Sequence, residues 1–199
     1  MSYPIDTPKQ ALTRLKQGNE YYLTARQNPA DISPARRMET AHHGQHPFAA
    51  ILTCADSRVP PEHIFTAGIG NLFVVRTAGN IAGDFETGSI EYAVEHLGVP
   101  LILVMGHTHC GAVAAALEEP VPLHPASPPA SYTACVIREI QQGLHGNPDE
   151  AAAVYQNTQH SKRQLLCSGI IRAATHKGEV ALLCARYNTA TGRVTFFDC

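Results

Sequence analysis

The sequence has no tryptophan, few charged residues and no excess of either charge sign. Lys and Arg together number 15 against 17 Asp and Glu, which gives a formal net charge of -2. A protein that attracts nucleic acid or anionic lipid over a distance needs a positive excess. The composition therefore predicts no nucleic-acid partner.

Long hydrophobic runs are also missing. The longest apolar stretches, residues 48–52 and 99–105, are much shorter than the roughly 20 residues of a membrane-spanning helix. The first residues lack the basic-then-apolar order of a secretory signal. We therefore expect no membrane partner and a cytoplasmic location.

Cysteine is too sparse for a disulfide scaffold, with six residues in a chain of 199. In a reducing compartment, a Cys that pairs with His more often binds a metal or takes part in catalysis. The hydrophobic fraction of 44% against 16% charged residues is typical of a folded globular chain. We expect one domain over residues 1–199, with a helical arm at about 7–43.

Short apolar runs alternate with helical periodicity along the chain. A helix is expected at 7–23, and a further one lies between 34 and 43 in an otherwise loop-like stretch. The expected strands are 48–53, 72–76, 100–107, 179–187 and 193–197, and the remaining helices are 87–97, 112–118, 132–144 and 149–176, the last interrupted near 168. This order predicts an α/β domain with a mostly parallel sheet covered by helices on both faces and an antiparallel edge strand at the C-terminus.

Metal-type ligands follow two of the predicted buried strands. Cys54 and Asp56 come after the first, and His107 and Cys110 come after the strand segment at 101–106. The carboxyl ends of neighbouring parallel strands meet at one sheet edge, where α/β proteins bind ligands. Two thiolates, an imidazole and a carboxylate suit zinc, although a buried Cys is by itself most often a small hydrophobic residue.

Asp56 and Arg58 place a carboxylate and a guanidinium two residues apart in an apolar setting. Either charge alone is costly to bury, so a charge-assisted pair is expected. This pair holds Asp56 either beside the metal or off it.

Four long motifs carry a family resemblance. They are Cys54-Ala-Asp-Ser-Arg-Val-Pro, Phe73-Val-Val-Arg-Thr-Ala-Gly-Asn, Ser89-Ile-Glu-Tyr-Ala-Val-Glu-His-Leu-Gly and Gly106-His-Thr-His-Cys-Gly. In sequence and spacing they resemble the β-class carbonic anhydrases of the prokaryotic type. The resemblance extends from about residue 11 to 197.

The resemblance implies one zinc ion per subunit, bound by Cys54, His107 and Cys110. Asp56 is then either the fourth ligand of a closed site or is held off the metal by Arg58, so that water takes its place. Zinc lowers the pKa of its water from about 15.7 toward 7, and the hydroxide attacks carbon dioxide to give bicarbonate and a proton. Asp56 accepts the hydroxide hydrogen. Because two thiolates neutralise the metal charge, we expect activity to rise through about pH 7 to 9.

The resemblance also implies a substrate pocket. It places Gln45 as a donor, Phe73, Ala78 and Tyr92 as walls, and the Gly111 backbone near the metal, with Tyr92 contributed by a neighbouring subunit in one reading. Without the motifs, Phe73 and Tyr92 are ordinary core residues and Gln45 is a surface residue. A homodimer or homotetramer is implied, with the N-terminal helix packing on the partner subunit.

Some positions depart from the family pattern. Thr77 stands where many members have Asn, and Ala78 is smaller than the Val of some members. Members with an inhibitory bicarbonate site use a Trp at the position of Ile51, together with an Arg and a Tyr that match Arg76 and Tyr92, and this chain has no Trp. We expect that site to be absent or altered and the zinc site to be open at neutral to alkaline pH.

The other candidate ligands are assigned no metal. His109 is expected to point away from His107 and Cys110, since it lies two residues along an extended or turning segment. The histidines of the N-terminal arm are either proton relays or solvated loop residues, and the remaining cysteines are core or terminal thiols. These residues are His42, His43, His46, Cys135, Cys167, Cys184 and Cys199.

Two other functions remain open. A zinc hydrolase of carbonyl sulfide or carbon disulfide uses the same ligands, and the width of the pocket and the proline-rich loop at 119–130 distinguish it. A closed structural or sensory site with Asp56 on the metal leaves no water there. The presence of Arg58 argues against a closed site.

Overall fold

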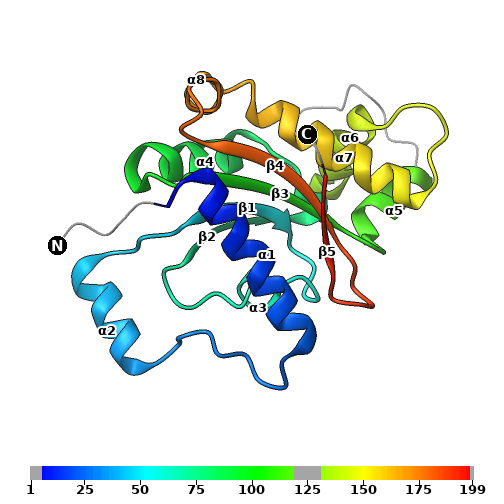
Figure 1. The fold of residues 1–199 in the computed structure, drawn as a ribbon. Helices are drawn as coiled ribbons and strands as arrows, with labels where there is room; N and C mark the ends of the chain where they lie inside the picture. Colours follow the sequence, from blue (N-terminus) through cyan, green and yellow to red (C-terminus); the bar gives the residue numbers. More distant parts are fainter. Residues whose placement is uncertain (1–5, 119–130, 198–199) are drawn as a thin grey trace.

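The chain folds around one five-stranded sheet in the order β2-β1-β3-β4-β5. The computed structural model describes residues 6–118 and 131–197 (Figure 1). The strands are β1 (Ala49–Cys54), β2 (Leu72–Thr77), β3 (Leu101–His107), β4 (Ala181–Tyr187) and β5 (Val194–Phe197). The first four pair in parallel and β5 pairs antiparallel to β4. The predicted mixed sheet is confirmed.

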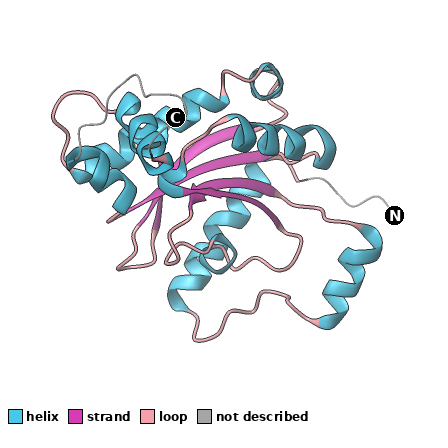
Figure 2. Cartoon of the chain, turned by 180° about the vertical axis from the view of Figure 1, so that it is seen from behind, coloured by secondary structure: helices cyan, strands magenta, loops and turns pink. Residues whose placement is uncertain are grey.

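Helices cover both faces of the sheet, as predicted (Figure 2). They are α1 (Pro8–Thr24), α2 (Pro34–His43), α3 (Pro61–Ile64), α4 (Asp84–Leu97), α5 (Gly111–Glu118), α6 (Tyr132–Gly143), α7 (Glu150–Leu165) and α8 (Gly169–His176), with a 3-10 turn, η1 (Ala78–Asn80). The short elements α3 and η1, each of a single turn, were not predicted. Helix α4 begins three residues earlier than predicted, because the Glu86 carboxylate that accepts the Gly83 N–H extends this helix at its N-terminus.

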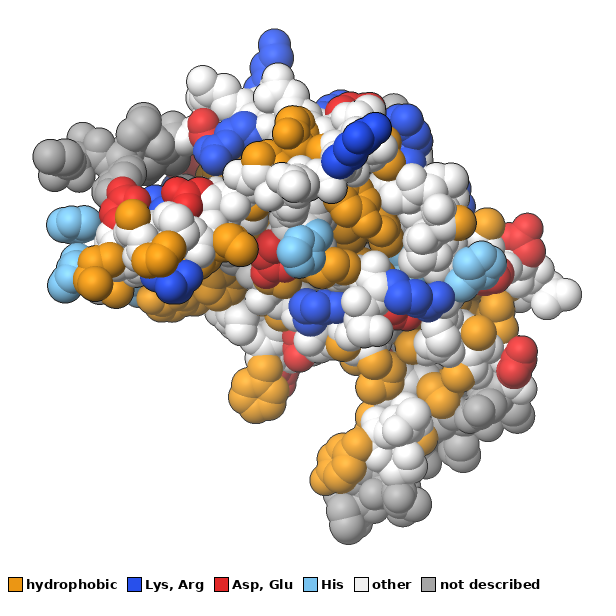
Figure 3. Space-filling view, turned by 90° about the horizontal axis from the view of Figure 1, so that it is seen from below, with side chains coloured by type: hydrophobic (Ala, Val, Ile, Leu, Met, Phe, Trp, Pro, Cys, Tyr) orange, Lys and Arg blue, Asp and Glu red, His pale blue; other side chains and the backbone are white. Residues whose placement is uncertain are grey.

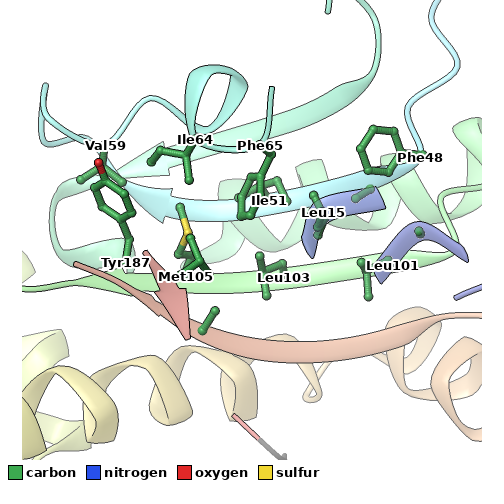
Figure 4. Packing of buried hydrophobic residues seen from close by; sticks show 14 residues of the cluster. Leu15, Phe48, Ile51, Val59, Ile64, Phe65, Leu101, Leu103, Met105 and Tyr187 are labelled. Carbon is green, nitrogen blue, oxygen red and sulfur yellow. The ribbon is translucent and has the colours of Figure 1, made fainter. Parts of the chain in front are cut away.

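Alternating side chains of the strands divide the core in two. On one face Ile51, Leu103 and Met105 pack with Leu15 of α1 and Ile64 of α3 (Figure 4). On the other face, Leu52, Ile102 and Val104 pack against α4, α7 and α8. Because β1 and β3 are covered on both sides, their apolar runs are continuous.

The N-terminal helix α1 packs on the sheet of its own chain. Ala11, Leu15 and Asn19 are its buried residues. Asn19 donates to the carbonyls of Ile64 and Gly192 and accepts from the Val194 N–H. Only its outer face and the arm beyond it remain available for the expected partner subunit.

Helix α2 stands away from the sheet (Figure 1) and has no buried residue. Ile32 before it and Met38 within it are 68% and 61% exposed. Seen from below, hydrophobic side chains are interspersed with charged and other polar ones over the described surface of the molecule (Figure 3). No helix in the described part of the chain is long and apolar enough to cross a membrane. The proline-rich stretch at 119–130 lies outside the described residues.

Candidate metal centre

The ends of β1 and β3 bring three ligand-type side chains together. These neighbouring strands run in parallel, with Ala50 opposite Ile102 and Thr53 opposite Met105, so Cys54 and His107 end at the same sheet edge. Cys110 follows at the start of α5. The two sulfurs and a His107 ring nitrogen lie within 4.8 Å of one another, and all three residues are buried. The predicted convergence is confirmed.

The geometry of this cluster suits a tetrahedral metal ion. Zn–S bonds of about 2.3 Å place two sulfurs of a tetrahedron about 3.8 Å apart, and the two Sγ atoms here are 4.0 Å apart. His107 Nδ1 faces the Thr108 carbonyl at 3.0 Å, which assigns the ring proton to Nδ1. Nε2 is then a lone-pair acceptor, and it is buried without a hydrogen-bond partner among the described groups. A metal ion on Nε2 compensates that desolvation.

The two thiols are electrostatically unequal. Hydrogen bonding from Cys110 lowers the pKa of Cys54, with further help from backbone N–H groups. The same contact with Cys54, together with burial, raises the pKa of Cys110. Without a cation, one proton therefore stays between the two sulfurs. A divalent ion allows both to ionise, because it offsets the repulsion between two thiolates.

Asp56 is held beside the cluster by Arg58. The Arg58 Nε donates to Asp56 Oδ1 at 2.9 Å and an Nη to Oδ2 at 2.6 Å, while the same Nη donates to the His109 carbonyl at 3.0 Å. These hydrogen bonds from Arg58 hold the pKa of Asp56 well below its usual range. Asp56 Oδ2 lies 3.9 Å from His107 Nε2. The carboxylate is thus ionised and adjacent to the cluster, and Arg58 occupies both of its oxygens.

Arg76 has a positioning role at this site that was not predicted from the sequence. It lies on β2 opposite Thr53, and it donates to the carbonyls of Cys54 and Asp56 at 3.0 and 2.6 Å. It therefore ties the loop after β1 to the neighbouring strand. A charged residue inside an apolar strand was the signal available in the sequence.

The five predicted pocket residues fall into two groups within one chain. Ala78 directly follows β2 and Gly111 directly follows Cys110, so both adjoin the cluster. Phe73 pairs with Ala50 near the other end of β2, about 13 Å along the strand from the end of β1 at about 3.3 Å per residue. It therefore does not share a wall with Ala78 in the same chain.

Tyr92 and Gln45 also lie away from the cluster. The Tyr92 ring is 6.2 Å from that of Phe73 and 4.9 Å from that of His96, and it is 48% exposed. Gln45 is exposed on the loop before β1. A single chain therefore does not assemble the whole predicted pocket.

His109 points away from the cluster, as predicted. Its φ of 56° turns the chain, and its ring Nδ1 lies 3.3 Å from Glu150 Oε1. His42, His43 and His46 are exposed, and Cys184 is a core thiol, as predicted. Neither Cys135 nor Cys167 joins the cluster, but the prediction that they are core thiols is wrong, because Cys135 is half-buried and Cys167 is exposed just past the end of α7. Cys199 lies outside the described residues.

Comparisons with known proteins agree on one family. The profile of the carbonic anhydrase family matches residues 49–194. Carbonic anhydrase 2 of Mycobacterium tuberculosis is 36% identical over 98% of this chain and 95% of its own length. A carbonic anhydrase of Mycolicibacterium smegmatis is 33% identical over 96% and 94%.

Solved structures give the same result. The β-carbonic anhydrase of Coccomyxa, in complex with acetazolamide, superposes with a TM-score of 0.68 at 27% identity, covering 82% of this chain and 78% of the other. The β-carbonic anhydrase CcaA gives 0.67 at 28% identity, over 94% and 87%. A tetrameric β-carbonic anhydrase of Sordaria macrospora shares the fold, with a TM-score of 0.70 at 22% identity over 83% and 88%.

Proposed function

The chain belongs to the β-class carbonic anhydrase family, and from this premise we propose that it converts carbon dioxide and water to bicarbonate and a proton at one zinc ion held by Cys54, His107 and Cys110. The family and the fold support the reaction. The observation that carries the ligand set is the buried Cys-His-Cys cluster with its unpartnered His107 Nε2.

Cys54, His107 and Cys110 would hold the zinc ion, which when bound would supply a Lewis acid that lowers the pKa of water from about 15.7 toward 7. Asp56 then acts as an acceptor. Because Arg58 keeps its carboxylate ionised and fixed, Asp56 would accept a hydrogen bond from the attacking water or hydroxide and so orient it toward carbon dioxide. Arg58 acts through Asp56, because it holds both carboxylate oxygens and so would keep them from binding the metal.

The substrate pocket in this proposal has walls from two chains. Ala78 and Gly111 border the cluster from its own chain, and Phe73, Tyr92 and Gln45 come from a second copy. The support is geometric, since the latter three lie far from the cluster along their own chain and Tyr92 is half exposed. The proposed assembly is a homodimer or homotetramer in which the exposed α2 arm contacts the partner.

The alternative functions receive less support than carbon dioxide hydration. The named relatives are carbonic anhydrases, and nothing in the comparisons favours carbonyl sulfide or carbon disulfide as substrate. A closed structural site requires Asp56 on the metal, whereas Arg58 holds both of its oxygens. A reducing compartment such as the cytoplasm suits a site that needs two free thiols, and we propose that location.

Zinc stoichiometry tests the ligand set. The parent is expected to carry about one zinc per chain, measured by elemental analysis after gel filtration. Cys54→Ser is expected to lose most of it, and Cys135→Ser, outside the cluster, serves as the matched control. Full zinc content in Cys54→Ser, or loss of zinc in Cys135→Ser alone, contradicts the proposed site.

A further inference from the structure

The backbone turn after β2 connects the sulfur of Cys54 to helix α7. This turn, η1, carries Gly79, whose N–H donates to Cys54 Sγ at 3.3 Å. The carbonyl of the same residue accepts from Asn157 Nδ2 at 2.7 Å. Asn157 lies on α7 and is fully buried. One glycine thus links a buried amide to a proposed zinc ligand through a continuous chain of hydrogen bonds.

The position of Gly79 depends on these contacts. Its φ of 69° is in the left-handed region. Glycine adopts positive and negative φ about equally well, so its own backbone preference does not fix this conformation. A Cβ on it would lie 2.6 Å from Ile140 Cδ1 and 3.2 Å from Ala112 Cβ, so α5 and α6 limit the turn on their sides. Asn157 holds the carbonyl of Gly79. The N–H that points at Cys54 belongs to the preceding peptide group, which lies in the same short turn.

The hydrogen bond to sulfur matters for the metal. A thiolate ligand that accepts an N–H donates less charge to its metal, and groups that orient ligands commonly change metal affinity by about 10–100-fold when they are removed. Cys54 Sγ accepts only two backbone N–H groups in the described part of the chain, those of Gly79 and Asp56. Removing either changes a large share of its hydrogen bonding.

We propose that Asn157 is a positioning residue for the metal centre, which it controls by fixing the Gly79 carbonyl and with it the η1 turn, so that the Gly79 N–H stays directed at the Cys54 thiolate. The inference rests on the zinc site proposed above. The same turn begins with Ala78, so Asn157 also fixes one wall beside the cluster. Its role is remote, because its amide donates to a backbone carbonyl and does not reach the ligands.

The test uses the zinc-loaded enzyme with two variants, Asn157→Ala and the nearly isosteric Asn157→Leu, neither of which has a side-chain donor. Ser161→Ala is the matched control, since Ser161 is also buried on α7 and bonds within the helix to the Asn157 carbonyl. Zinc release to a chelator is expected to accelerate about tenfold or more in both Asn157 variants and to stay within about twofold of the parent in Ser161→Ala.

A spectroscopic readout separates positioning from general destabilisation. In cobalt-substituted protein, loss of the N–H donor raises the energy of the sulfur lone pairs, so the sulfur-to-cobalt charge-transfer band is expected to shift to longer wavelength in the Asn157 variants. If both Asn157 variants bind zinc and cobalt as Ser161→Ala does, the inference is overturned even if they unfold at a lower temperature. If the parent itself binds no zinc, the proposed function fails instead, and the two failures are distinguishable.

Discussion

Replacing Gly79 by Ala is expected to damage both the fold and the metal centre, and a second glycine provides the comparison. Gly79 and Gly146 have the same φ of 69°. A Cβ on Gly79 would meet Ile140 and Ala112, whereas a Cβ on Gly146 has nothing within 4 Å. The two substitutions therefore share the cost of a left-handed backbone and differ in packing and in contact with Cys54.

The expected losses of stability follow from the cost of the left-handed backbone and the cost of overpacking. An L-residue in the left-handed region costs about 1–2 kcal/mol, which is the whole cost expected for Gly146→Ala. Overpacking adds about 1–3 kcal/mol, and the lower part of that range applies to Gly79→Ala because Ile140 Cδ1 is the end of a side chain that can rotate. The sum for Gly79→Ala is about 2–4 kcal/mol, or roughly 4–16 °C in Tm at about 2–4 °C per kcal/mol for a chain of this size.

Thermal unfolding and zinc analysis on the same samples measure both effects. Gly79→Ala is expected to lose more Tm than Gly146→Ala and also to bind zinc more weakly, because a displaced turn withdraws its N–H from Cys54. Gly146→Ala is expected to keep its zinc. Equal losses of Tm with full zinc in both variants would refute the reasoning.

Three further outcomes are expected. Arg58→Ala frees Asp56 to compete for the fourth ligand position, so carbon dioxide hydration near pH 7 should fall at least about tenfold with unchanged zinc content; an unchanged rate argues against the role of the pair. Arg58 lowers the pKa of Asp56, so the stability that Asp56 contributes is present above its unfolded pKa near 3.9 and is lost as pH falls toward the lower folded value. The Tm measured from about pH 6 to 3 should therefore drop more steeply in the parent than in Asp56→Asn. Parallel Tm curves in the two proteins would count against a stabilising role of the ionised Asp56. Removing zinc with a chelator should lower Tm in the parent and leave Cys54→Ser unaffected, since a ligand stabilises only the state that binds it; equal responses contradict the ligand assignment.

Much of the fold was predictable because its signals are local. The apolar runs of β1 and β3 are long enough to mark strands buried on both faces, and the residues that follow them had to meet at one edge once the strands were parallel. The Asp56–Arg58 pair was equally local, since two residues of opposite charge sit two positions apart. These features required no knowledge of the tertiary packing.

The rest depended on register and on contacts between distant elements. Nothing in the order of residues revealed that Phe73 pairs with Ala50 and so lies far from Ala78, which divides the predicted pocket between two parts of the chain. The link from Asn157 to Gly79 spans α7 and η1, and a buried Asn on a helix gives no local sign of its partner. Arg76 was visible as a charged strand residue, but its carbonyl partners depend on the loop after β1.

The central claim is tested most directly by stopped-flow carbon dioxide hydration at about pH 7.0 and 8.5, with the rate expressed per zinc and Asp56→Ala measured beside the parent. The account predicts rapid hydration by the parent, faster at the higher pH, and a rate reduced by at least about tenfold in Asp56→Ala at equal zinc content. No hydration by fully zinc-loaded parent protein at either pH would contradict it.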